Sequence, residues 1–321
     1  MLIINILWII LGMILLIKGG DMLVDGASSL ARCFKIPELV IGLTIVAFGT
    51  SAPELVVSLS AAISSHSEIA LGNVIGSNNL NLFFILGIIG IIAPVTVQKN
   101  TFRIEIPLSL LAAVILFLLA NLNFLPDEIN MLTRVDGIIL FLFFGLFLFY
   151  IYKSMKPTNI VDGKSPVKML SSVKIILFII FGLAFLVLGG KIVVNSAVSI
   201  AQTLHISEKV IGLTIIALGT SLPELVTSIT AVIKKSSDIA IGNIIGSNIF
   251  NIFMILGISS IIHPIKYSLS FNEDIYILMF GTVLLLLAMV IGKKNKLDRW
   301  EAAIFILFYI GYVIYLITRN G

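Results

Sequence analysis

Two stretches of the chain decide its fold: GLTIVAFGTSAPELVVS, residues 42–58, and GLTIIALGTSLPELVTS, residues 212–228, which stand 170 residues apart. Each places a proline and then a glutamate, Pro53-Glu54 and Pro223-Glu224, inside an apolar segment long enough to cross a bilayer. A carboxylate at membrane depth indicates a functional site, and a proline there interrupts the helix. Two such segments in matching halves of a chain predict the binding site of a transporter.

The composition excludes a soluble domain. Of the 321 residues, 59% are hydrophobic and only 12% are charged, and the apolar runs repeat at the roughly 20 residues needed to span about 30 Å of hydrocarbon. These features predict an all-α polytopic protein embedded in a lipid bilayer. The net charge of +4 is modest and the basic residues lie in loops, which argues against a nucleic-acid partner. A single cysteine, Cys33, excludes a disulfide framework and a cysteine metal cluster.

Ten membrane spans are expected, five in each half of the chain. The first is interrupted at Gly19-Gly20, and the second and seventh are broken before their prolines. Their approximate bounds are 2–30, 37–64, 68–93, 103–121, 133–152, 172–203, 207–233, 238–263, 272–291 and 299–318.

The two halves of the chain are copies of one another. Residues 37–94 align with residues 207–264 without a gap, and 36 of the 58 positions are identical. Because five spans are an odd number, the second copy enters the membrane from the opposite side, which is an inverted-topology repeat. The expected organisation is a first repeat at 1–152, a polar linker at 153–171 and a second repeat at 172–321.

Loop charges predict the orientation. With both termini outside, the inside loops hold fifteen of the 21 Lys and Arg residues, the outside loops and tail hold four, and two lie within spans. By the positive-inside rule, both termini are outside the cell membrane and the linker is cytoplasmic. The apolar start of the chain lacks the basic region and cleavage site of a signal peptide, so it is interpreted as the first span.

A second pair of motifs follows the first. It comprises GNVIGSNNLNLFFILG at 72–87 and GNIIGSNIFNIFMILG at 242–257. Asn73, Ser77 and Asn81 recur every four residues and therefore share one helix face, as do their counterparts at 243, 247 and 251. Glycines in the same motifs allow helices to approach closely. Packing is an equally good explanation for any one Gly, Ser or Thr, but it does not explain two glutamates with no basic neighbour in the sequence.

The polar groups of these motifs are all oxygen donors. They comprise two carboxylates, amides, hydroxyls and the main-chain carbonyls that are freed where helices break before proline, around Ala47–Thr50 and Ala217–Thr220. Such a set suits a hard cation such as Ca²⁺ better than zinc or copper. The C-terminal ends of the half-helices also favour a cation.

GTSAPEL, GTSLPEL and the two GNxIGSN runs resemble the paired repeats of the sodium/calcium exchanger family, within the cation/calcium exchanger superfamily. The likeness covers essentially the whole chain and is to the prokaryotic ten-helix members. It implies a Ca²⁺ site at Thr50, Glu54, Thr220 and Glu224. It implies Na⁺ ligands at Ala47, Thr50, Ser51, Glu54, Ser77, Asn81, Ala217, Thr220, Ser221, Glu224, Ser247 and Asn251. Some members carry Asp where this chain has Asn251, so only two carboxylates remain here.

The expected function is therefore secondary-active antiport, in which Na⁺ is exchanged for Ca²⁺ by alternating access. Electrogenic 3:1 coupling without potassium is expected, because potassium-coupled relatives carry an acidic residue at the position of Asn251. Proton/calcium antiport is the close alternative if burial makes the glutamates bind protons. A cation channel could use the same acidic residues, but broken helices in inverted copies favour a transporter. An intramembrane hydrolase lacks its motifs, so no enzyme activity, cofactor or obligatory protein partner is expected.

Overall fold

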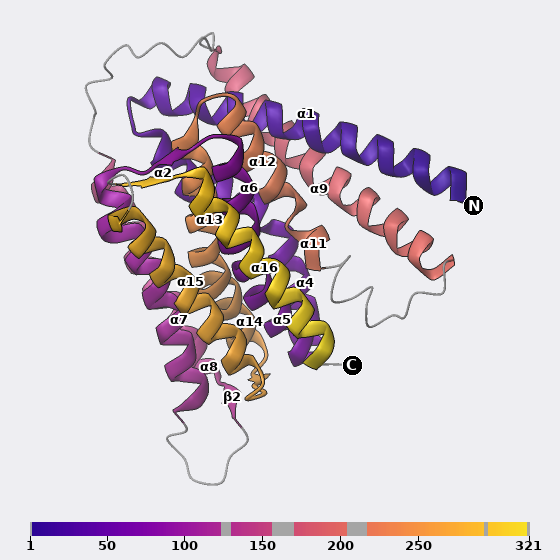
Figure 1. The fold of residues 1–321 in the computed structure, drawn as a ribbon, viewed down its shortest axis with the longest axis vertical. Helices are drawn as coiled ribbons and strands as arrows, with labels where there is room; N and C mark the ends of the chain where they lie inside the picture. Colours follow the sequence, from indigo (N-terminus) through magenta and orange to yellow (C-terminus); the bar gives the residue numbers. More distant parts are fainter. Residues whose placement is uncertain (1, 123–129, 156–169, 204–216, 292–294, 320–321) are drawn as a thin grey trace.

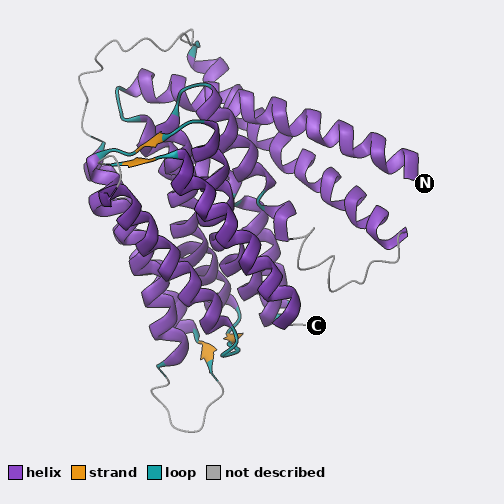
Figure 2. Ribbon diagram, in the orientation of Figure 1, coloured by secondary structure: helices purple, strands orange, loops and turns teal. Residues whose placement is uncertain are grey.

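The protein is a bundle of membrane-length helices, and the computed structural model describes residues 2–122, 130–155, 170–203, 217–291 and 295–319. Helices α1 (Leu2–Phe34) and α9 (Ser172–Thr203) lie side by side and extend away from the others (Figures 1 and 2). The first half continues with α2 (Glu38–Ile41), η1 (Gly42–Val46), α3 (Ala47–Thr50), α4 (Ala52–Ile63), α5 (Ser67–Asn79), η2 (Leu80–Ile85), α6 (Leu86–Ile92), η3 (Thr101–Glu105), α7 (Ile106–Asn121) and α8 (Arg134–Ser154). The second half continues with α11 (Ala217–Thr220), α12 (Leu222–Ile233), α13 (Ser237–Ile249), η5 (Phe250–Leu256), α14 (Gly257–Ile262), α15 (Phe271–Ile291) and α16 (Arg299–Arg319).

The expected class, an all-helical polytopic membrane protein, is confirmed. Among the described residues, 8 helices are long and apolar enough to cross a membrane, or 9 when the bent pair Glu38–Thr50 and Ala52–Ile63 counts as one span. The seventh expected span, 207–233, falls partly on residues 207–216, which lie outside the described residues, as does most of the linker. The count of ten and the division into two repeats therefore remain predictions.

Glycines hold α1 and α9 together. A Cβ on Gly12 would lie 2.9 Å from the carbonyl oxygen of Gly189, and one on Gly182 would lie 3.0 Å from that of Gly19, so only glycine permits this backbone approach. The expected interruption of the first span at Gly19-Gly20 is wrong, because α1 is continuous from Leu2 to Phe34. These glycines serve close packing, and in a membrane neighbouring helices and internal hydrogen bonds keep a helix intact through them.

The second span is broken where proline demands it. Helix α3 ends at Thr50, Ser51 has φ −83° and ψ 8°, and α4 begins at Ala52 with Pro53 in its first turn. The two pieces are bent by 47°, because proline has no N–H for the preceding turn. In the second half Ser221 has nearly the same geometry, φ −92° and ψ 8°, before α12. The expected break is confirmed in α3–α4.

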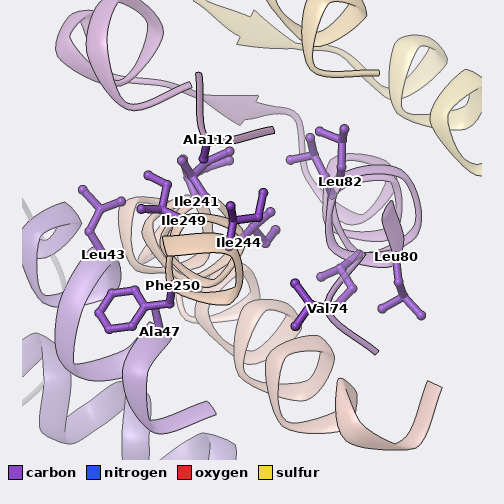
Figure 3. Packing of buried hydrophobic residues seen from close by; sticks show 14 of the residues in the cluster. Leu43, Ala47, Val74, Leu80, Leu82, Ala112, Ile241, Ile244, Ile249 and Phe250 are labelled. Carbon is purple, nitrogen blue, oxygen red and sulfur yellow. The ribbon is translucent and has the colours of Figure 1, made fainter. Parts of the chain in front are cut away.

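Helix α13 runs through the centre of the molecule, and nearly all of its residues are buried. Figure 3 shows Ile244 of α13 between Leu43 and Ala47 on one side and Val74 on the other. Gly246 makes this crossing possible, because a Cβ there would lie 2.8 Å from the Cβ of Ala47. Helices η1 and α3 of the first half therefore pack directly on α13 of the second half.

Two short antiparallel strand pairs join the halves at opposite ends of the bundle, as Figure 2 shows. Strand β1 (Val95–Thr96) pairs with β4 (Lys296–Leu297), and β2 (Met131–Leu132) pairs with β3 (Ile265–Lys266). Each pair takes one strand from each half of the sequence, so the loops of one half are tied to the other at both ends.

The halves nevertheless differ in how α1 and α9 rest on the bundle. A Cβ on Gly20 of α1 would meet Val226 of α12 at 3.2 Å, whereas the nearest atoms to a Cβ on the equivalent Gly190 of α9 are Gly219 O and Pro223 Cδ at 3.8 Å, which lie in α11 and α12 and not in α4. Val226 is half-buried, but its counterpart in α4, Val56, is 63% exposed. Helix α1 therefore covers α12, while α9 leaves the matching face of α4 uncovered.

An ion-pair cluster accompanies the covered contact. Lys234 Nζ at the end of α12 lies 2.9 Å from Asp25 Oδ1 and 3.2 Å from Asp21 Oδ1, both in α1. The positions equivalent to Lys234 and Asp25 hold the uncharged residues Ser64 and Asn195. The position equivalent to Asp21 holds Lys191, so the sequence offers no matching set of opposite charges between α9 and α4.

The crossing of α2 and η1 with α13 predicts a stability difference between two glycine variants. A Cβ on Gly242 would lie 2.7 Å from Leu39 O and 2.8 Å from Leu43 N, so Gly242→Ala should destabilise the protein by about 1–3 kcal/mol, the usual cost of overpacking. The measurement is the midpoint of thermal unfolding in detergent. Gly145→Ala in α8 is the control, because nothing lies within 4 Å of its Cβ, and equal midpoints would contradict the interpretation of the crossing.

Candidate functional site

The two motif glutamates lie at the centre of the site. Glu54 is the third residue of α4 and Glu224 is the third residue of α12, and both are fully buried. Each follows a break in its helix, so each carboxylate lies at a helix N-terminus, where the helix dipole favours negative charge. The sequence places the break and the carboxylate together because proline, the second residue of each new helix, directly precedes the glutamate.

Each glutamate is bound by a serine from the other half. Ser51 Oγ donates to Glu224 Oε1 at 2.9 Å, and Ser221 Oγ donates to Glu54 Oε1 at 3.0 Å. Ser77 Oγ also donates to Glu54 Oε1 at 3.3 Å and lies 2.8 Å from Ser221 Oγ. The two broken helices, 170 residues apart in sequence, therefore form one site.

The second oxygen of each carboxylate is left over. Glu54 Oε2 and Glu224 Oε2 are buried without a hydrogen-bond partner among the described residues. The ion pairs found in that part of the chain involve neither glutamate. Burying a carboxylate without a counter-charge costs many kcal/mol, so an arrangement with two of them requires a positive charge from a bound ion or from protons.

The motif threonines use their hydroxyl groups to hold the helices together. Thr50 Oγ1 donates to Asn243 Oδ1 at 2.9 Å, and Thr220 Oγ1 donates to Asn73 Oδ1 at 3.3 Å. Helices α3 and α11 end at these two threonines, and the last carbonyls of a helix lack partners within it. Each threonine can therefore offer its main-chain carbonyl to an ion.

The other sequence-predicted residues lie around the glutamates. Asn81 and Asn251 are fully buried, and Oδ1 of each has no hydrogen-bond partner in the described part of the chain. Ser247 is buried on α13, and Ala47 is buried at the start of α3. Ala217 begins α11, but its side chain and the preceding residues of its motif lie outside the description.

Sequence reasoning missed two residues of this centre. Asn78 and Asn248 are buried beside the site, where Asn248 Oδ1 accepts from Asn81 Nδ2 at 3.1 Å and Asn78 Oδ1 accepts from Asn251 Nδ2 at 2.9 Å. Both are the last residue of a GSN triplet, which is the signal that was available. A four-residue periodicity selected the neighbouring serines instead, because Asn78 and Asn248 stand one position off that helix face.

Among the described residues, no group of three or more His, Cys, Asp or Glu side chains could hold a metal ion. The centre instead combines two carboxylates with neutral hydroxyl, amide and carbonyl oxygens. That chemistry, enclosed by membrane-length helices that break beside it, defines an ion transporter. The sodium/calcium exchanger protein family matches residues 4–153 and 174–318. The chain belongs to this family, and it is a transporter rather than an enzyme.

Individual relatives agree with this assignment along nearly the full chain. The sodium/calcium exchanger MaX1 of Methanosarcina acetivorans is 32% identical over 351 residues, covering 98% of this chain and 99% of that protein. The inner membrane protein YrbG of Escherichia coli is 37% identical over 294 residues, covering 86% of each. A solved structure of the sodium-calcium exchanger NCX_Mj, soaked with Na⁺ and Ca²⁺, has a TM-score of 0.83 and 32% identity, covering 98% of this chain and 99% of that one.

The shared geometry predicts that neither glutamate can replace the other. Glu54→Gln or Glu224→Gln should each lower ion exchange by at least about a hundredfold, since removing one charge from a buried pair, here a carboxylate and the ion that it binds, costs about 3–5 kcal/mol. Exchange is measured in proteoliposomes at equal amounts of folded protein. Glu68→Gln on the exposed face of α5 is the matched control, and near-normal exchange by either site variant would contradict a shared site.

Proposed function

We propose that the protein exchanges Na⁺ for Ca²⁺ across the cell membrane, one ion class after the other at the same centre. The supporting observation is the pair of buried glutamates, each with an oxygen that lacks a hydrogen-bond partner among the described residues. Ca²⁺ is assigned to Thr50, Glu54, Thr220 and Glu224. Na⁺ is assigned to Ala47, Thr50, Ser51, Glu54, Ser77, Asn81, Ala217, Thr220, Ser221, Glu224, Ser247 and Asn251.

The chemistry of the centre supports Ca²⁺ as one substrate. Ca²⁺ takes about 6–8 oxygen ligands and accepts carboxylates, amides and main-chain carbonyls together. Glu54 and Glu224 supply two charges that match one divalent ion, and the main-chain carbonyls at Thr50 and Thr220 supply neutral oxygens. No cofactor is assigned, because the ions themselves are the substrates.

Neutral oxygens around the same carboxylates support Na⁺ as the exchanged ion. Ser77 and Ser221 already contact Glu54, and the amide oxygens of Asn81 and Asn251 have no hydrogen-bond partner among the described residues. Several monovalent ions could therefore each take some of the oxygens that a single Ca²⁺ would bind together. MaX1 and NCX_Mj are both named as exchangers of sodium and calcium. Proton/calcium antiport is the second candidate, because a proton could bind the oxygen of either glutamate that has no partner among the described residues.

The unequal contacts of α1 and α9 support alternating access. Val226 lies under α1, whereas the equivalent Val56 of α4 is exposed. If 1–152 and 172–321 are inverted repeats joined by the linker 153–171, exchanging the two arrangements would uncover the centre from the opposite side. The protein therefore needs only two arrangements of the same contacts to present one site to each side in turn.

The choice of driving ion can be tested directly. Purified protein in liposomes loaded with Na⁺ should take up ⁴⁵Ca²⁺ when the outside lacks Na⁺, because outward Na⁺ movement supplies the free energy. A pH gradient of equal magnitude without Na⁺ should give uptake no greater than that of Glu54→Gln. Uptake driven by the pH gradient alone would favour the proton antiporter instead.

The coupling ratio follows from the charge of the centre. Two carboxylates balance one Ca²⁺ or two Na⁺, so a third Na⁺ leaves one extra positive charge, and transport should respond to membrane potential at about 2.3 kcal/mol per charge per 100 mV. Because Asn251 adds no carboxylate, flux should persist in potassium-free buffer. The potential is imposed with a proton gradient and a protonophore. An absolute need for potassium, or flux indifferent to the potential, would contradict this account.

The predicted orientation places both termini outside and the linker in the cytoplasm. Cys33, the single cysteine, is exposed near the end of α1, on the side that the loop charges assign to the cytoplasm. A membrane-impermeant thiol reagent should therefore label it in inverted vesicles and not in intact cells. The reverse pattern would overturn the orientation, and a Cys33→Ser variant controls for background labelling.

A further inference from the structure

Asn78 and Asn248 form a reciprocal bridge where α5 crosses α13. Asn78 Nδ2 donates to the main-chain oxygen of Asn248 at 3.2 Å, and Asn248 Nδ2 donates to the main-chain oxygen of Asn78 at 3.4 Å. Both side chains are at most 1% exposed. Neither residue belongs to the ligand set assigned above.

The bridge fixes the orientation of the side-chain amides of Asn78 and Asn248. A main-chain carbonyl can only accept a hydrogen bond, so each asparagine must turn its amide nitrogen toward the opposite backbone. The nitrogen and oxygen of an amide have nearly the same shape and are assigned from their partners. Here the partner leaves one choice, and Oδ1 of Asn78 and of Asn248 must point away from the bridge.

The same orientation passes to the next residue on each side. Oδ1 of Asn248 accepts from Asn81 Nδ2 at 3.1 Å, and Oδ1 of Asn78 accepts from Asn251 Nδ2 at 2.9 Å. Each site asparagine therefore directs its amide nitrogen toward the bridge, and the nitrogen of Asn251 makes a second, longer contact of 3.4 Å with Ser77 Oγ. Its own oxygen remains buried without a hydrogen-bond partner in the described residues, which is the orientation a cation requires.

We propose that Asn78 and Asn248 are positioning residues, each of which orients the amide of a site asparagine so that oxygen, and not the N–H₂ group, faces the ion. The inference rests on the proposed function, because it concerns the same centre. Asn78 of the first half orients Asn251 of the second, and Asn248 of the second half orients Asn81 of the first. Each half therefore sets a ligand of the other.

An ordinary packing role makes a different prediction. If Asn78 only held α5 against α13, its loss would have the same effect whatever residue stood at 251. If it orients Asn251, it becomes dispensable once residue 251 is aspartate, because a carboxylate presents an oxygen in either orientation. The dependence of one substitution on the other separates the two roles.

The test is a double-mutant cycle. For each variant we would measure the Ca²⁺ concentration that half-saturates Na⁺-driven exchange, together with the maximal rate of exchange and the midpoint of thermal unfolding. Asn78→Ala should raise that concentration about tenfold, or about 1.4 kcal/mol, with little change in maximal rate. In a protein that already carries Asn251→Asp, Asn78→Ala should raise the half-saturating Ca²⁺ concentration less than about threefold, because the aspartate no longer needs the positioning contact. The crossed control, Asn248→Ala in the Asn251→Asp background, should still raise it about tenfold, because Asn81 still needs orientation.

The outcomes are separable. If wild-type protein shows no Na⁺-driven Ca²⁺ exchange, the proposed function fails. If it exchanges normally but Asn78→Ala has the same effect in both backgrounds, or none in either, the positioning role is overturned. Should Asn78→Ala fail to give folded protein, Asn78→Ser takes its place in the cycle, because its shorter side chain cannot reach both Asn248 and Asn251.

Discussion

The constraint on which the structure depends is the burial of two carboxylates without a basic partner among the described residues. Glu54 and Glu224 each have one oxygen held by a serine of the other half and one oxygen left over. Burying carboxylates in this way costs free energy, which suits a site where a positive ion binds and is released. A lysine beside them would stabilise the fold and would also occupy the position of the ion.

The helices around this centre are held in place by close packing and by hydrogen bonds. Glycines let α13 cross η1 and α3 at backbone distance, and Asn73 and Asn243 fasten the broken helices through Ser58 and Ser228. Several polar contacts of the first half have a counterpart in the second: Ser51 Oγ to Glu224 matches Ser221 Oγ to Glu54 at 2.9 and 3.0 Å, whereas the contacts of Ser77 with Glu54 and Ser221 have none. A two-fold repetition of contacts gives an ion comparable ligands from both sides, which suits a site that must be released toward either face of the membrane.

The two halves also differ in their contacts. Helix α1 covers α12 and is joined to it by Lys234, Asp21 and Asp25, whereas the matching face of α4 is open. Under the proposed alternating access of two inverted repeats, this structure would be one of two arrangements of the halves. A membrane interior permits such a rearrangement, because a helix can slide on small residues without exposing unsatisfied backbone groups.

The sequence by itself determined the helical membrane class, the break in the second span and the two buried glutamates, because proline and carboxylates in apolar segments permit few interpretations. It did not single out Asn78 and Asn248. Local patterns also suggested an interruption at Gly19-Gly20, which was wrong, since whether a glycine breaks a helix or admits a neighbour depends on what packs there. Only the tertiary structure decided that Ser51 binds Glu224 and not Glu54, and that Asn78 faces Asn251. These contacts join residues about 170 positions apart, and their geometry depends on how helices cross, which no local spacing encodes.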